Sequence, residues 1–86
     1  MIVGLNRICT HAGKELRVQV EDLGVETAAF EVRVYDGGSV AWHKRIAYAE
    51  LIQQGLSREA LEDQLRAMME KTLHTVEAAI AKGKLQ

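Results

Sequence analysis

Carboxylates at the ends of two alternating segments are the first side chains in this sequence that could do chemistry. Glu21 and Asp22 close one segment and Asp36 closes the next. Two carboxylates facing each other can act as a general acid and base, which requires a separation within about 10 Å. In an antiparallel hairpin of strands of about eight residues, these points lie roughly 25 Å apart. We therefore interpret these acids as turn formers rather than as a catalytic pair.

The histidines and the single cysteine are the next candidates for chemistry. His11 falls in an expected turn, His43 in a strand and His74 in a helix, where Glu70 lies one turn before it. A Glu and a His at that spacing make half a metal site, and we interpret them as a surface pair. Cys9 alone forms neither an intramolecular disulfide nor a thiolate zinc site within one chain. We predict no catalytic residue, no metal and no cofactor, with an enzyme completed at a dimer interface as an alternative.

Alternation of apolar and polar residues predicts the strands that would position these side chains. The expected strands run over about residues 3–10 (the weakest), 16–21, 30–35 and 40–46. Gly13 and the pair Gly37-Gly38 are turn signals, so consecutive strands should pair as an antiparallel meander. We predict a single domain over residues 1–86, with a four-stranded antiparallel sheet and helices that follow it.

Two helices are expected after the strands. The first runs over residues 48–54 and is closed by Gly55, and Ser57 caps a long amphipathic helix from about Arg58 to about Lys82. The fold class is therefore α+β, with the long C-terminal helix packed on one face of the sheet. The predicted core consists of Leu16, Val18, Val20, Phe30, Val32, Val34, Val40, Trp42, Leu51, Leu61, Leu65 and Met68.

The predicted helix is longer than the predicted sheet. About 25 helical residues span about 37 Å, whereas strands of about eight residues span about 27 Å. Leu73, Val76 and Ile80 continue the apolar stripe past the expected end of the sheet, where they would form an exposed patch. We therefore predict a homodimer that buries these three residues between two chains.

The polar face of the sheet is the candidate binding surface. Basic side chains beside an aromatic ring suit a nucleic-acid strand. Glu21 and Glu31 share this face, however, and the chain has a net charge of −1, without the positive excess that phosphate binding favours. We predict binding to another protein, with nucleic-acid binding as the alternative. The residues of this face are Arg17, Arg33, Tyr35, His43 and Arg45.

Composition favours a folded protein in aqueous surroundings. Apolar residues make up 48% of the chain and charged residues 27%, which is ordinary for a globular domain. The longest apolar run falls short of the roughly 20 residues that cross a bilayer, and residues 1–13 lack the pattern of a secretory signal. We expect a cytoplasmic protein without a membrane partner.

Three segments resemble a group of small uncharacterised bacterial proteins. Gln19-Val20-Glu21-Asp22-Leu23-Gly24 is followed by Gly37-Gly38 and by Lys44-Arg45-Ile46-Ala47-Tyr48-Ala49-Glu50-Leu51. The group has V-Q-T-E-D-x-G, then G-G, then K-K-x-x-Y-A-D-L and a long terminal helix. The resemblance covers residues 13–83 and implies a bacterial source, but no assigned activity. We interpret the chain as a small non-enzymatic interaction or regulatory module.

Overall fold

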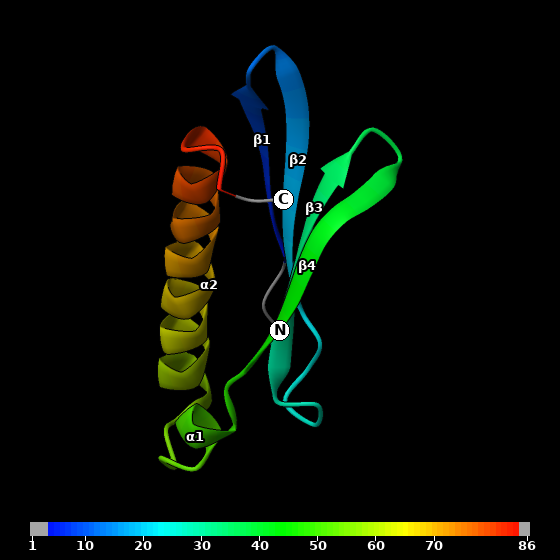
Figure 1. The fold of residues 1–86 in the computed structure, drawn as a ribbon. Coiled ribbons are helices and arrows are strands. Elements are labelled where there is room, and N and C mark those ends of the chain that lie inside the picture. Colours follow the sequence, from blue (N-terminus) through cyan, green and yellow to red (C-terminus); the bar gives the residue numbers. More distant parts are fainter. Residues whose placement is uncertain (1–3, 85–86) are drawn as a thin grey trace.

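Four strands follow one another as a meander in the computed structural model, which describes residues 4–84 (Figure 1). The strands are β1 (Leu5–His11), β2 (Lys14–Asp22), β3 (Ala29–Asp36) and β4 (Ser39–Ala47), paired antiparallel in that order. Two helices follow, α1 (Ala49–Ile52) and α2 (Arg58–Ala81). The predicted fold class is confirmed. No helix in this part of the chain is long and apolar enough to cross a membrane.

Helix α2 begins and ends where its sequence signals predict. The Ser57 side-chain oxygen accepts a hydrogen bond of 3.2 Å from the backbone N–H of Ala60, which caps the first turn. After the last turn, Gly83 adopts a φ of +69°, and the N–H of Lys84 donates to the carbonyl of Ala79 at 2.9 Å. These two caps hold a helix that lies along the sheet (Figure 1).

Tyr48 attaches the start of α1 to the loop between β2 and β3. Its hydroxyl donates to Asp22 Oδ1 at 2.6 Å, and its ring stacks on Phe30 at 6.4 Å between centroids. Asp22 Oδ1 also accepts from the N–H of Gly24 at 3.1 Å, and Gly24 has a φ of +97° that favours glycine. Burial and the Asp22 carboxylate raise the pKa of Tyr48. The end of β2 and the start of α1 therefore meet at this hydrogen bond.

The core lies between α2 and the inner face of the sheet. Seven predicted core residues are buried there: Val18, Val20, Phe30, Val32, Val34, Leu51 and Leu65. Leu16, Trp42, Leu61 and Met68 pack against this core but are only half-buried. Met69, adjacent to Met68, is fully buried instead, because the centre of the α2 stripe runs through it.

The prediction that Leu73, Val76 and Ile80 project past the sheet as dimer contacts is wrong. Their exposed fractions are 2%, 5% and 3%, because they pack against the sheet of their own chain. The C-terminal end of α2 lies beside the end of β1, where Gly83 is next to His11, and the β1–β2 hairpin extends beyond the helix (Figure 1). The N-terminal end is covered by α1 and the β2–β3 loop, which the comparison of lengths had left out.

The prediction that Val40 belongs to the core is also wrong. β3 and β4 shift register by one residue, so that Val34 pairs with Trp42 but Tyr35 pairs with Val40. Ala41 is the extra residue of this β-bulge. The bulge turns Val40 onto the outer face with Tyr35, and Val40 is 48% exposed.

Candidate functional site

Helix α2 covers only part of the inner face of the sheet. It packs chiefly against β1 and β2, while β4 stands apart from it at the other edge (Figure 1). One reason is an attachment to β1, where Glu77 of α2 lies 3.9 Å from Arg7 Nε and 3.9 Å from Cys9 Sγ. The inner side of β4 is consequently only partly covered by α2.

A groove of about 360 Å³ lies between β4 and α2. Its β4 wall is formed by Trp42, Lys44 and Ile46, of which Trp42 and Ile46 are half-buried. Its α2 wall is formed by Lys71, Thr72, Thr75, Val76 and Ala79. The groove is mostly apolar, and no carboxylate lines it among the residues described. We call this feature the β4–α2 groove.

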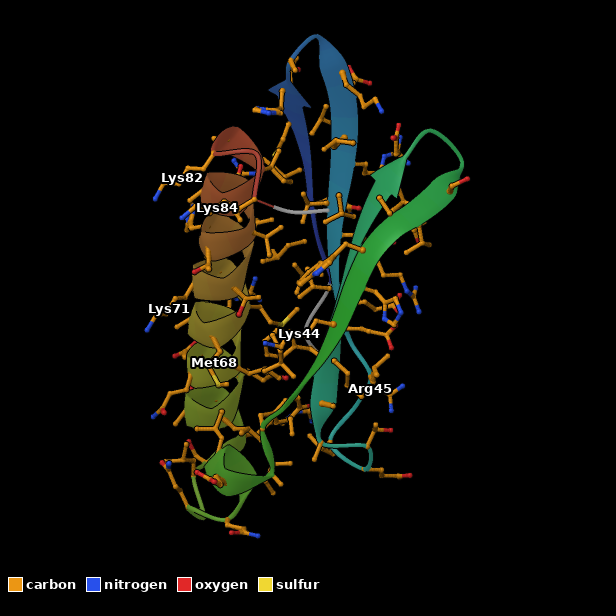
Figure 2. All side chains as sticks on the ribbon, in the orientation of Figure 1. Lys44, Arg45, Met68, Lys71, Lys82 and Lys84 are labelled. Carbon is orange, nitrogen blue, oxygen red and sulfur yellow. The ribbon has the colours of Figure 1, made fainter. Side chains whose placement is uncertain are left out.

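Lysines supply the charge of the β4–α2 groove. Figure 2 shows Lys44 on the α2 side of β4 and Arg45 on the opposite side, as alternation along a strand requires. Lys71 lines the helix wall with its stem, and its ammonium group points away from β4 (Figure 2). The groove is therefore mostly apolar, with Lys44 as the cation on its β4 wall.

The two sides of α2 differ in charge. At about 100° per residue, the side that carries Thr75 and Ala79 faces β4, and the side that carries Glu77 faces β1. The β4 side holds Leu61, Gln64, Met68, Lys71, Thr72, Thr75, Ala79 and Lys82, without a carboxylate. The β1 side holds Glu59, Asp63, Arg66, Glu70 and Glu77. The helix thus carries most of its acids on the side away from the groove.

Strand β4 borders the groove with a free edge. It is the last strand of the sheet, and within residues 4–84 only β3 pairs with it. Such an edge offers unpaired backbone N–H and C=O groups to another strand. The inward-pointing Lys44 and the bulge at Ala41 are features that protect an edge from indiscriminate pairing. This edge therefore favours a strand that neutralises Lys44 over a second copy of itself.

A second hollow continues along β4 and α2 toward α1. It has a volume of about 430 Å³ and is lined by Ala47, Tyr48, Glu50 and Met68, among others. Met68 lies one helical turn before Lys71 and Thr72, and Ala47 follows Ile46 on β4. The two hollows together extend along the free edge for most of its length.

The predicted binding face is assembled as expected on the outer face of the sheet, the side directed away from α2. Cross-strand pairing aligns Arg17 with Tyr35, Arg33 with His43, and Glu31 with Arg45. Glu31 forms ion pairs with Arg33 and with Arg45, the latter at 3.3 Å. Two of the three arginines of this face are therefore already engaged by a carboxylate of their own chain.

The side chains considered for catalysis are placed apart or engaged structurally. Asp22 and Asp36 lie at opposite ends of the β2–β3 ladder. His74 Nδ1 lies 3.3 Å from Glu77 rather than forming a pair with Glu70. Burial, with Glu77 nearby, raises the pKa of the Cys9 thiol, which lowers its thiolate fraction. No cluster of metal-ligating side chains occurs in the described part of the chain.

One residue of the β4–α2 groove had a signal in the sequence. Lys44 interrupts the apolar side of the fourth strand, which is the signal that this side is not fully covered. The position of α2 nearer to β1 carries no comparable signal, so Thr72, Thr75 and Ala79 were not identifiable as groove residues. Ile8 and Val40, exposed on the outer face, were missed as well.

Comparisons with protein-family models, curated proteins and solved structures find no match to this chain. The geometry of the groove and of the outer face is therefore the basis for a functional proposal.

Proposed function

We propose that this protein is a small non-enzymatic protein-interaction module that binds an extended, acidic segment of a partner protein in the β4–α2 groove. The observation that carries the proposal is the combination of the free edge of β4 with an apolar, carboxylate-free groove beside it. Addition of a strand to an exposed sheet edge is a common mode of peptide recognition, in which backbone hydrogen bonds give affinity and side-chain pockets give specificity.

The inner residues of β4 define what such a segment should contain. Trp42, Lys44 and Ile46 alternate along the groove side. Side chains directly opposite each other on neighbouring strands interact most strongly. A bound strand would therefore place an apolar residue opposite Trp42, an acidic residue opposite Lys44, and an apolar residue opposite Ile46. The expected motif is apolar, any, Asp or Glu, any, apolar.

Charge supports an acidic partner over a second β4 strand. An identical strand would bring a second copy of Lys44 close to the first, and like charges facing each other across strands are destabilising. An acidic segment instead pairs with Lys44 and lies beside the side of α2 that carries Lys71 and Lys82.

The location of the site can be tested by selecting displayed random peptides of about twelve residues against the wild-type protein. Thr75→Trp should fill the groove, because Thr75 is an exposed residue of its helix wall, and we expect selected peptides to bind this variant at least about tenfold more weakly. His74→Trp is the matched control, since His74 is exposed on the other side of the helix. Equal binding to both variants would contradict the proposed location.

The chemistry of the partner is tested by the sequences selected. We expect them to be enriched in the motif above, and Lys44→Glu should shift selection from acidic to basic residues at its centre. Arg17→Glu, an equal charge change on the outer face, should leave the selection unchanged. Peptides with no excess of Asp or Glu, or the same excess after Lys44→Glu, would overturn the acidic-partner proposal.

A further inference from the structure

A row of cross-strand neighbours on the outer face includes two exposed apolar side chains. Ile8 pairs with Arg17, Arg17 with Tyr35, and Tyr35 with Val40, so that the row crosses all four strands. Its two ends, Ile8 and Val40, are 57% and 48% exposed. Val40 lies there only because of the bulge in β4. The face therefore has an uncovered apolar side chain at each of its two edges.

A hollow lies beside one end of this row. It has a volume of about 240 Å³ and is lined by Ile8, Glu15, Arg17, Tyr35 and Gly37. Val40 is at the opposite end of the row, on the other edge of the sheet. One face thus carries an apolar side chain without a covering partner in the described structure and, at the other end of the same row, a hollow that Ile8 lines.

We propose that the outer face binds a second copy of this chain, with a two-fold axis parallel to the strands and passing between β2 and β3. This rotation places β1 opposite the partner's β4 and β2 opposite the partner's β3. Each cross-strand row then lies opposite the same row of the partner. Ile8 then meets the partner's Val40, and Arg17 meets the partner's Tyr35. Aliphatic contact and a guanidinium stacked on an aromatic ring are favourable pairings at interfaces.

The charges of the face are compatible with self-association. Arg17, Arg33 and Arg45 are balanced by Glu15, Glu21 and Glu31, so two copies meet without net repulsion. The rotation brings Glu21 near the partner's Glu31, a repulsion that the arginines already paired with Glu31 offset. The same balance disfavours nucleic acid, because phosphate binding depends on a positive excess.

The size of the face sets the expected strength of the dimer. Four strands at about 4.8 Å spacing and about eight residues in length cover roughly 500 Å² per chain, or roughly 1,000 Å² in total. This area is at the lower limit for a specific interface, which predicts a weak dimer that dissociates on dilution. The outer face lies opposite the β4–α2 groove, so a second copy and a partner segment do not compete.

The test is the mass in solution measured by sedimentation equilibrium between about 10 μM and about 1 mM, a range that spans weak association. We expect the wild-type mass to rise toward that of a dimer, and Val40→Glu to remain a monomer. Val25→Glu is the matched control, because Val25 is 55% exposed but lies in the β2–β3 loop rather than on this face. A wild-type protein that stays monomeric at every concentration, or an equal loss of association in both variants, would overturn the proposal.

A rescue experiment tests the two-fold arrangement itself. Because Ile8 meets the partner's Val40, the double variant Ile8→Lys with Val40→Glu should restore association, whereas Ile8→Glu with Val40→Glu should not. Equal behaviour of the two double variants would refute this axis. A wild-type monomer that binds single-stranded RNA, with salt-dependent affinity lost in Arg17→Glu, would assign the face to nucleic acid and refute the dimer.

Discussion

Replacement of Leu73 by alanine should destabilise the monomer, because this side chain is only 2% exposed and packs within the core of its own chain. Loss of a buried leucine costs about 2–5 kcal/mol, through lost burial and the cavity left behind. A domain of this size has a total stability of roughly 4–13 kcal/mol, so the variant should lose a large fraction of it. Leu73→Ala therefore distinguishes a core residue from the dimer contact that helix length alone had predicted.

The assay is urea denaturation followed by circular dichroism at low and at high protein concentration. We expect a lower midpoint with an unchanged slope at both concentrations, because the contact lies within one chain. Lys71→Ala, an exposed change on the same helix, should alter the free energy of unfolding by no more than about 0.5 kcal/mol. A loss below about 1 kcal/mol, or one seen only at high concentration, would refute the packing described here.

Three further predictions concern local features of the fold. Tyr48→Phe should cost about 1.5–3 kcal/mol, because the hydroxyl donates to the Asp22 carboxylate. The raised pKa of Tyr48 adds stability that is fully present below the unfolded-state pKa of about 10 and is lost as pH rises through the higher folded-state pKa. Denaturation measured between neutral and alkaline pH should therefore show a smaller alkaline loss of stability in the Phe variant than in the wild type. Parallel curves of stability against pH for the two proteins would contradict the raised pKa. Ser57→Ala should lower thermal stability by about 1 kcal/mol through loss of the α2 cap, and calorimetry that detects no change would argue against the cap. Cys9 should be alkylated by iodoacetamide at pH 8 more slowly than an unfolded cysteine peptide, because its thiol pKa is raised, and an equal rate would contradict its burial beside Glu77.

The regular part of the fold was predictable because local patterns determine it. Alternation in β2 and β3 identifies Val18, Val20, Val32 and Val34 as facing the core, and the capping signal at Ser57 fixes the start of α2. The turns carry glycines where positive φ is needed, as at Gly13 and Gly37. These signals suffice for the meander and for the helix that covers it.

The errors have long-range causes. The bulge at Ala41 depends on how β4 pairs with β3, and the residues around it contain no glycine that would mark it. The burial of Ile80 depends on how far the β1–β2 hairpin extends along α2. A comparison of helix and strand lengths does not include this hairpin. The β4–α2 groove exists because α2 lies nearer to β1, a consequence of tertiary contacts such as Glu77 with Arg7.

The proposed partner site has a built-in reporter, because Trp42 is the only tryptophan and lines the β4–α2 groove. The decisive measurement is the emission of Trp42 during titration with a tryptophan-free peptide selected by display, alongside calorimetry that reports binding wherever it occurs. We predict a saturable shift of the emission to shorter wavelength, with the same dissociation constant as calorimetry, because the bound strand covers the half-buried indole. Binding detected by calorimetry with unchanged Trp42 emission would place the peptide elsewhere and contradict the β4–α2 groove as the interaction site.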